Sequence, residues 1–331
     1  MHKYILNYAK SNFPVALKLS NLVTYQKHYN EYKNCYIGSN FMHHEIKTRL
    51  AHRVKELSRY DCLHNITNLY ATSFTKLNNI EGIKTQDDVS KFVSTLEQIK
   101  FDHNYIALDI SRSLRNLYQN EFSDEINKFL DKFYMSRIGL RTIIGNYVSV
   151  HKDGCSIVQD KCYPYKVIKD AIFQSRDMCD ILYNVRPRID IIGPKDFTFR
   201  YIPSHLFYIT LELIKNSMKS VVMTKGDSEE SNIKIYISKG SDDLIIKISD
   251  FGGGFSRNNL DQVFSYGYTT EKKVPTENDK VVLSGFGHGV PLSRLYCRYF
   301  GGDLHLIPFD GIGTDAIIYI NRLETANENL I

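Results

Sequence analysis

Three glycines at alternate positions, Gly285, Gly287 and Gly289, constrain this chain more than any other short feature, because a helix pattern follows them directly. Glycine adopts positive-φ conformations readily, and without a side chain its backbone amides are open to a bulky anion. Pro291 suits a first helical turn, and the apolar spacing after it predicts a helix that ends at Gly301-Gly302. A glycine loop that leads into a helix predicts a phosphate-binding site.

Two other interpretations of this loop stay open. A dinucleotide-binding Rossmann turn also has spaced glycines, with an acidic residue about twenty residues later, here Asp303 or Asp310. Against it, the chain after the loop is too short for the further crossovers of a doubly wound sheet. The other alternative is a glycine-rich turn with no ligand.

Composition and length are those of an ordinary globular protein, with 331 residues, 43% apolar and 24% charged. Such a length favours two domains. The net charge of +5 comes without a dense Lys/Arg block, so nucleic acid binding is not expected. No apolar run is long enough for membrane insertion. The six cysteines contain no Cys-x-x-Cys pair, which predicts free thiols in a reducing compartment.

The amino-terminal stretch allows two interpretations. It is rich in lysine and has no acidic residue before Glu31, as in a mitochondrial presequence, yet it lacks arginine. Leu17, Leu19, Leu22 and Val23 could equally be core positions of a first helix.

Residues 1–153 contain few glycines and show apolar spacing of three to four residues, which predicts a four-helix bundle. The expected helices are Phe41–Tyr60, Thr85–Lys100, Ile106–Gln119, Asp124–Leu130 and Phe133–Val150, with Asp88 and Ser123 as caps. The polar segment His151–Tyr165 marks the domain boundary.

Residues 154–325 change pattern, with strands that alternate in polarity, and residues 326–331 form a short tail. Helices segregated from a mixed, mainly antiparallel sheet make an α/β sandwich, so the predicted fold class is α+β. The expected elements are helices Tyr165–Tyr183 and Ser204–Met223 and strands Arg188–Ile192, Phe197–Tyr201, Ile233–Ser238, Leu244–Ser249, Leu304–Pro308 and Thr314–Ile320.

One polar stripe runs along the helix expected at 204–223, made of Glu212, Lys215, Asn216 and Lys219. A solvated helix face is the plain interpretation. Asparagine is a weak helix former, however, and its presence in the middle favours a functional role. Its amide oxygen suits a hard cation, and Glu212 one turn earlier is a proton acceptor.

A carboxylate ends the strand expected at 244–249, where Asp250 is followed by Phe251, Gly252, Gly253 and Gly254. An aspartate at this place can accept a hydrogen bond from the exocyclic amine of a base. The Asp-Phe-Gly letters do not indicate a eukaryotic-type kinase, because its His-Arg-Asp loop and Val-Ala-Ile-Lys strand are missing. The chain also lacks a Gly-x-x-x-x-Gly-Lys-Ser/Thr phosphate loop.

In order and spacing, Glu212…Asn216, Asp250-x-Gly-x-Gly, Gly285-x-Gly-x-Gly and Gly313-Thr314-Asp315 resemble the nucleotide-binding boxes of the GHKL superfamily, whose ATP-binding domain has the Bergerat-type fold. Longer segments resemble the mitochondrial pyruvate dehydrogenase kinase and branched-chain 2-oxoacid dehydrogenase kinase family over nearly the whole chain. These are MHHEIKTRLAHRVKEL (42–57), FDHN (101–104), FLDKFYMSRIGLR (129–141), YIPSHLFYITLELIKNSMKS (201–220), YGYTT (266–270), and GFGHGVPLSRLYCRYFGGDL with GIGTDAIIYI.

The resemblance implies a role for each matching residue. Glu212 would be the general base, Lys215 would help neutralise charge, and Asn216 would bind Mg²⁺. Asp250 would take the adenine amino group, with Thr314 nearby. Gly252 and Gly254 would line the base and ribose, and the amides around Gly285, Gly287, His288 and Gly289 would hold the phosphates. Further nucleotide contacts are expected from Lys219, Tyr268, Thr269, Thr270, Phe286 and Val290, under a lid formed by residues 271–284.

The implied function is that of a protein serine kinase in the mitochondrial matrix that uses MgATP. Its substrate would be the decarboxylase alpha subunit of a 2-oxoacid dehydrogenase complex, most simply pyruvate dehydrogenase, which phosphorylation inactivates. The lipoyl domain of the acyltransferase core would be its docking partner, and the family implies a homodimer. Tyr208 departs from the histidine that pyruvate dehydrogenase kinases usually have there and resembles the branched-chain kinase. The chain also has no tryptophan, so the family's closing Asp-Trp motif is missing.

Two rival functions remain. The run from His44 to Leu50 imitates the phosphoacceptor box of sensor histidine kinases, which would make the protein a histidine autokinase. The box has Arg49 where those kinases usually carry proline, and His44 could be an ordinary polar residue on a bundle helix. The other rival is an ATPase that uses nucleotide for conformational switching.

Overall fold

A computed structural model describes residues 2–32, 36–118, 122–226, 232–269, 287–322 and 327–330 of the chain. They divide into two compact units. The first comprises residues 1–119, 129–158 and 330–331, and the second comprises residues 120–128 and 159–329. The domain limits expected from the sequence, 1–153 and 154–325, stay a prediction.

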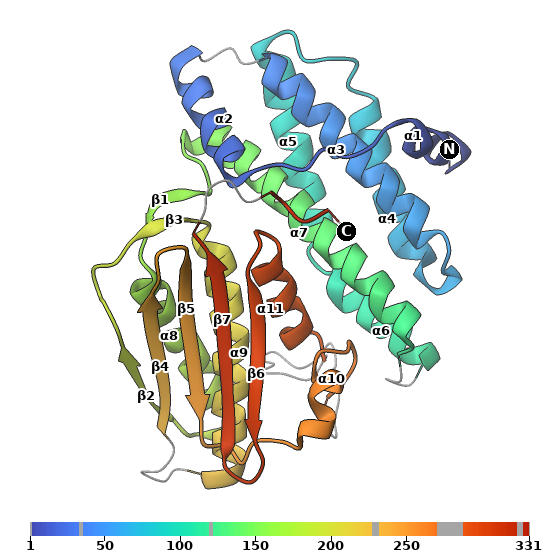
Figure 1. The fold of residues 1–331 in the computed structure, drawn as a ribbon. Coiled ribbons are helices and arrows are strands. Elements are labelled where there is room, and N and C mark those ends of the chain that lie inside the picture. Colours follow the sequence, from blue (N-terminus) through green and yellow to red (C-terminus); the bar gives the residue numbers. More distant parts are fainter. Residues whose placement is uncertain are drawn as a thin grey trace. The chain divides into compact units, whose positions relative to one another are not determined.

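Apart from a single bridge residue at Lys18, the described secondary structure of the first unit is helical (Figure 1). Its elements are α1 (His2–Ser11), α2 (Leu19–Tyr32), α3 (Tyr36–Leu57), the 3-10 helix η1 (Asp61–Leu63), α4 (His64–Asn78), α5 (Gln86–Asp102), α6 (Ile106–Tyr118) and most of α7 (Asp124–Asp153). Four apolar residues of the amino-terminal stretch are core residues, as one interpretation expected, since Leu17, Leu19, Leu22 and Val23 are buried. The four-helix bundle as such stays a prediction.

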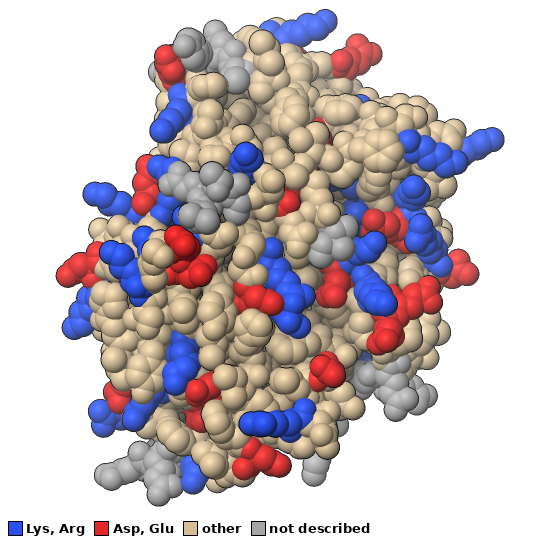
Figure 2. Space-filling view, viewed as in Figure 1, with Lys and Arg blue, Asp and Glu red and all other residues tan. Residues whose placement is uncertain are grey.

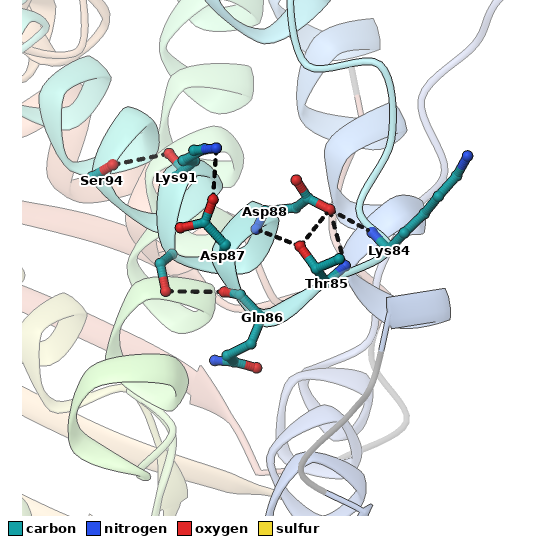
Figure 3. A network of polar contacts seen from close by, with 8 residues as sticks. Lys84, Thr85, Gln86, Asp87, Asp88, Lys91 and Ser94 are labelled. Atoms are coloured by element: carbon teal, nitrogen blue, oxygen red, sulfur yellow. Dashed lines mark hydrogen bonds and ion pairs between the residues drawn. The ribbon is translucent and has the colours of Figure 1, made fainter.

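Helix α5 begins with a reciprocal cap that the sequence indicated only in part (Figure 3). The Thr85 hydroxyl accepts a hydrogen bond from Asp88 N at 3.2 Å, and Asp88 Oδ2 accepts one from Thr85 N at 2.9 Å. Thr85 is therefore the N-cap, and Asp88, which was expected to be the cap, is the third residue of a capping box. Such a box satisfies amides that the first turn leaves without partners, which is why the helix starts here.

Two expectations about the helices were wrong. The segments Asp124–Leu130 and Phe133–Val150 form the single helix α7, because Asp131 and Lys132 are polar residues on a continuous helix and not a link. Helix α4 was not predicted, since its apolar positions are mixed with Thr, Asn and His. It buries Ile66, Tyr70, Phe74 and Leu77 at intervals of three to four residues, as a core-facing helix does.

The second unit contains both helices and strands, so the α+β class is confirmed. Its elements are β1 (Gln159–Cys162), α8 (Pro164–Tyr183), β2 (Arg188–Ile192), β3 (Phe199–Tyr201), α9 (Pro203–Lys225), β4 (Asn232–Lys239), β5 (Asp243–Asp250), the 3-10 helix η2 (Arg257–Asn259), α10 (Leu260–Val263), α11 (Gly289–Arg298), β6 (Asp303–Phe309) and β7 (Gly313–Asn321).

Five strands form one sheet in the order β2-β4-β5-β7-β6. Only β2 and β4 are parallel, and the other neighbours are antiparallel, in agreement with the predicted mixed, mainly antiparallel sheet. The strand predicted at 197–201 is shorter and belongs to a separate two-stranded sheet, in which β3 pairs with β1. Strand β1 lies inside the segment that was read as a polar linker.

Helices α8, α9 and α11 lie on one face of the five-stranded sheet (Figure 1). Alternate strand residues point toward them and form the core, while their neighbours point to the opposite face. The buried set comprises Ile233, Ile235, Ile237, Leu244, Ile246, Ile248, Ala316, Ile318 and Ile320. Helix α9 packs against β4 and β5, which places its polar stripe near the end of β5.

Helix α11 is fixed to β6 by a cluster of charges. Asp303 Oδ1 accepts hydrogen bonds from Arg294 Nε and Arg298 Nε, both at 2.9 Å, and its Oδ2 accepts one from Arg298 Nη2 at 3.0 Å. Burial by itself would raise the pKa of Asp303, but the bonds from Arg298, Arg294 and the Leu304 amide outweigh it and lower the pKa to about 2. The Arg294 guanidinium also lies 4.4 Å from the ring centroid of Phe264.

The surface carries charges of both signs. On the face shown in Figure 2, Lys and Arg side chains are interspersed with Asp and Glu, in keeping with the small net charge. Across the described residues, no helix combines the length and the hydropathy that a membrane span needs.

Replacing Asp303 by asparagine is expected to lower the free energy of unfolding by about 1–2 kcal/mol at pH 7, because the two arginines lose a charged acceptor. The folded-state pKa of Asp303 lies below the ordinary value, so its contribution is present above about pH 4 and is lost as the pH falls toward 2. Urea unfolding of wild type and variant at pH 7 and pH 3 measures both effects. Asp310→Asn, on the exposed β6–β7 turn, is the matched control. If this variant lost as much stability as Asp303→Asn, the charge cluster would not be the cause of the loss.

Candidate active site

The polar stripe predicted on α9 is present, and its first two members form an ion pair. Lys215 Nζ lies 2.6 Å from Glu212 Oε1, and the exposed fractions of the two side chains are only 10% and 17%. Asn216 and Lys219 are half-buried on the same helix. A largely buried ammonium that touches one carboxylate oxygen fixes the orientation of the other oxygen.

The second oxygen of Glu212 faces the first residue of α11. A Cβ atom added to Gly289 would lie 2.6 Å from Glu212 Oε2, so only glycine lets this helix start so close to the carboxylate. His288 is the N-cap residue of α11. The first amides of a helix have no partner within it and attract negative charge. The predicted phosphate site therefore lies next to Glu212, the predicted general base.

Asp250 ends β5 with its carboxylate buried and hydrogen-bonded on both oxygens. Oδ1 accepts bonds from Gly252 N at 3.0 Å and Thr314 N at 3.3 Å, and Oδ2 accepts one from the Ser217 hydroxyl at 2.9 Å. The side chain is 8% exposed. Burial raises the pKa of the Asp250 carboxyl, while the bonds from Gly252, Ser217 and Thr314 oppose that rise. Thr314 lies next to Asp250, as expected.

The glycine turn after Asp250 packs directly on α9. The hydroxyls of Ser220 and Thr224 donate to Gly252 O at 2.8 and 3.0 Å, and a Cβ atom on Gly252 would lie 2.4 Å from Ser220 Oγ. Gly254 has a positive φ of 63° and approaches the carbonyl oxygens of Phe309 and Gly313. Both glycines are thus required by packing within the protein, whatever they contact in a ligand.

The position of Asn216 follows from the contacts of its neighbours on the same side of α9. Residues 212, 216 and 220 are spaced by four and lie on one side of α9. Glu212 meets α11 at one end of this line, and Ser220 meets the turn after β5 at the other. Asn216 therefore lies between the predicted phosphate site and the predicted adenine site.

The remaining predicted residues lie beside the start of α11. Gly267 N donates to Gly287 O at 3.2 Å, and a Cβ atom on Gly287 would lie 2.7 Å from Tyr268 O. The stretch that contains Tyr268 and Thr269 is thus in contact with the stretch before Val290. Thr270, Gly285, Phe286 and the predicted lid 271–284 lie outside the described residues.

Sequence reasoning missed three residues of this site. Ser217 and Ser220 hold the turn after β5, and Asn127 Oδ1 accepts a hydrogen bond from Tyr266 N at 2.9 Å. Gly313, which the sequence placed in the Gly313-Thr314-Asp315 box, leaves no room for a Cβ atom beside the Asp250 carbonyl oxygen. The two serines carried one signal, since they are three residues apart and therefore lie on the same side of the helix.

A bound metal ion would be coordinated by Asn216 and by oxygens of the bound nucleotide. Among the described residues, no group of three or more His, Cys, Asp or Glu side chains is arranged to hold a metal. A single neutral amide oxygen fits Mg²⁺ that keeps water and phosphate oxygens as its other ligands.

The imitation of a phosphoacceptor box in α3 has a structural explanation. Arg49 Nε donates to Glu45 Oε1 at 2.7 Å, and both side chains are 1% exposed. Together they hold the segment before α2: Val15 N donates to Glu45 at 3.0 Å, and Val15 O accepts from Arg49 Nη2 at 2.9 Å. His44 is exposed and bonds to the Tyr8 hydroxyl at 3.2 Å. The charged letters of this motif therefore serve packing within the first unit.

Tyr208, the other departure from the family pattern, packs on α11. Its ring centroid lies 4.7 Å from that of Tyr296, which lies 4.9 Å from the ring of the buried His205. An aromatic contact thus joins α9 to α11 one turn before Glu212.

Two family profiles match different parts of the chain. A family profile described as mitochondrial branched-chain alpha-ketoacid dehydrogenase kinase matches residues 16–163. A second, described as histidine kinase-, DNA gyrase B-, and HSP90-like ATPase, matches residues 201–324 and thus includes α9, Asp250 and α11.

Individual relatives cover most of the chain. A mitochondrial pyruvate dehydrogenase (acetyl-transferring) kinase of Arabidopsis thaliana is 35% identical over 324 residues, which are 90% of this chain and 88% of the relative. The Drosophila melanogaster enzyme of the same name is 35% identical, over 88% of this chain and 78% of its own. Human isozyme 3 is 32% identical, over 86% and 78%. The chain therefore belongs to the mitochondrial pyruvate dehydrogenase kinase and branched-chain 2-oxoacid dehydrogenase kinase family of the GHKL superfamily.

Proposed function

We propose that this chain is a mitochondrial protein kinase that transfers the γ-phosphoryl group of ATP to a serine of the decarboxylase component of the pyruvate dehydrogenase complex. The observation that carries the proposal is the placement of α9, whose polar side reaches Asp250 through Ser217 and reaches the start of α11 through Glu212. Its relatives are named as kinases of that enzyme.

Asp250 recognises the base in this proposal. A carboxylate only accepts hydrogen bonds, so it suits the 6-amino group of adenine. Its buried position excludes water that would compete for the amine. Thr314, Gly252 and Gly254 surround it, and Tyr268, Thr269 and Lys219 lie on the neighbouring segments.

The phosphates bind at the start of α11, where the amides of Gly287, His288 and Gly289 and the helix dipole favour negative charge. Asn216 is the protein ligand of Mg²⁺. When bound, the ion neutralises charge on the phosphates. Lys215 supplies a further positive charge next to Glu212.

Glu212 is the general base. A serine hydroxyl becomes a good nucleophile only when a neighbouring group accepts its proton as the new bond forms. Glu212 Oε2 is on the side of α9 that faces α11, so the acceptor lies next to the phosphate-binding backbone. Phosphoryl transfer requires mainly alignment and charge neutralisation, and these residues provide both.

The protein partners follow from the family. The decarboxylase alpha subunit is the substrate, and the lipoyl domain of the acyltransferase core is the docking partner in the mitochondrial matrix. For a homodimer, the sheet face opposite α9 offers Tyr236, Ile245, Ile317 and Tyr319, which the strand register places together. No described helix of the second unit covers that face (Figure 1).

A branched-chain 2-oxoacid dehydrogenase complex is the second candidate substrate. Two observations favour it: the profile that matches residues 16–163 carries that name, and Tyr208 takes the place of a histidine. Incubation of the kinase with labelled ATP and each purified complex separates the two candidates.

Glu212→Gln is expected to reduce phosphorylation of the decarboxylase subunit by about 10²–10⁴-fold, the usual loss when a general base is removed. ATP binding should change little, because the base contacts the acceptor and not the nucleotide. The measurement is transfer of label from ATP, followed by acid treatment.

Wild type should give acid-stable label, as phosphoserine does, and the exposed Glu81→Gln should match it. Acid-labile label on the kinase itself would indicate a histidine autokinase instead. ATP hydrolysis without any labelled protein would indicate a conformational ATPase.

Asp250→Asn is expected to weaken ATP binding by roughly 10–100-fold, since a hydrogen bond to a charged group is lost. The folded-state pKa of Asp250 is raised, so its contribution to stability is greatest below the ordinary Asp pKa and is lost as the pH rises through the folded value. At neutral pH the variant should therefore unfold at the same temperature as wild type or higher.

Calorimetric titration with ATP and thermal unfolding measure the two effects. In wild type, ATP affinity should also fall on acidification, and from a higher pH than an ordinary aspartate would give. A variant with lowered thermal stability and unchanged ATP binding would contradict the proposal that Asp250 recognises adenine.

A further inference from the structure

The Asp250 carboxylate is held by three donors from three separate segments of the second unit. Gly252 N comes from the turn after β5, Thr314 N from β7, and the Ser217 hydroxyl from α9. Ser217 is 5% exposed, so its hydroxyl is as buried as the carboxylate that it contacts. It is the only side-chain donor to Asp250 among the described contacts.

The three donors are divided unequally between the two carboxylate oxygens. Each oxygen accepts about two hydrogen bonds. The amides of Gly252 and Thr314 fill Oδ1, whereas Oδ2 receives only the Ser217 hydroxyl. The remaining acceptor position is therefore on Oδ2, the oxygen that Ser217 orients.

This inference rests on the proposed ATP site: we propose that Ser217 is a positioning residue that sets selectivity for a 6-aminopurine nucleotide. It acts through Asp250, by fixing Oδ2 so that its open acceptor position meets the exocyclic amine of the base. A 6-oxopurine would bring a carbonyl oxygen against that carboxylate oxygen, and two acceptors repel each other.

The charges near Asp250 show why its carboxylate requires the Ser217 hydroxyl as a donor. Asp315 on β7 adds repulsion to the Asp250 carboxylate and is itself paired with Lys247 at 3.2 Å. The two amides are fixed by the backbone and reach only Oδ1. Among the described contacts, the Ser217 hydroxyl is the one that stabilises negative charge on Oδ2, and a hydrogen bond to the charged form favours that form.

The next serine on α9 provides a matched comparison. Ser220 is one turn further along the helix, and its hydroxyl donates to the Gly252 carbonyl at 2.8 Å and not to a carboxylate. Thr224 bonds to the same carbonyl at 3.0 Å. Loss of the Ser220 hydroxyl should therefore loosen the turn without affecting recognition of the amine.

The test measures binding of ATP, GTP and purine riboside triphosphate, which has hydrogen in place of the 6-amino group, to the full chain by calorimetry. Ser217→Ala should weaken ATP by about tenfold, as loss of a hydrogen bond to a charged group does, and change purine riboside triphosphate by less than about twofold. The preference for ATP over GTP should fall in parallel. Ser217→Cys keeps the volume with a weaker donor and should fall between wild type and alanine.

Steady-state kinetics give a second measure. In Ser217→Ala the KM for ATP should rise about tenfold while kcat at saturating ATP stays within about twofold, because Ser217 touches no reacting atom. Ser220→Ala should weaken ATP and purine riboside triphosphate by the same factor.

Two outcomes overturn the proposal. One is a Ser217→Ala variant whose ratio of ATP to purine riboside triphosphate affinity equals that of wild type. The other is a cysteine variant that binds ATP as tightly as wild type, which would point to the volume of the side chain and not to the hydroxyl donor. If wild-type protein binds neither nucleotide, the proposed function fails, and this inference fails with it.

Discussion

Close packing between α9 and two backbone segments is the constraint on which the site depends. The helix approaches the turn after β5 at Gly252 and the start of α11 at Gly289. In both places a Cβ atom would lie less than 3 Å from a side-chain oxygen of α9, so any other residue would push the segments apart. One rigid helix thus sets the distance between the adenine site and the phosphate site, as alignment of a phosphoryl group requires.

Two aspartates of the second unit show how surroundings assign different tasks to one residue type. Asp303 faces two guanidinium groups, its pKa is lowered, and it anchors α11. The hydrogen-bond donors to Asp250 are neutral amides and a hydroxyl, and burial raises its pKa. Its charge is incompletely compensated by the protein, which is the state expected of a group that waits for a donor from a ligand.

The strands of the five-stranded sheet and the polar stripe could be predicted from the sequence, because both follow from a fixed period and from residues unusual at their positions. Strand β2 has the predicted bounds, and β4 to β7 differ by one or two residues. Helix α4 was missed because polar residues interrupt its apolar spacing, and α7 was divided at Asp131 and Lys132. The roles of Ser217 and Asn127 could not be predicted, since each depends on a contact between segments distant in sequence. The charged motif around His44 was misleading because Glu45 and Arg49 form a buried pair there.

The most direct test of the account is a structure of the protein with Mg²⁺ and a non-hydrolysable ATP analogue. The account predicts the adenine amine on Asp250 Oδ2, the terminal phosphates at the amides of Gly287–Gly289, and the ion at about 2.0–2.1 Å from the Asn216 amide oxygen, as Mg²⁺ requires. Nucleotide bound away from α9, or an ion with no contact to Asn216, would contradict it.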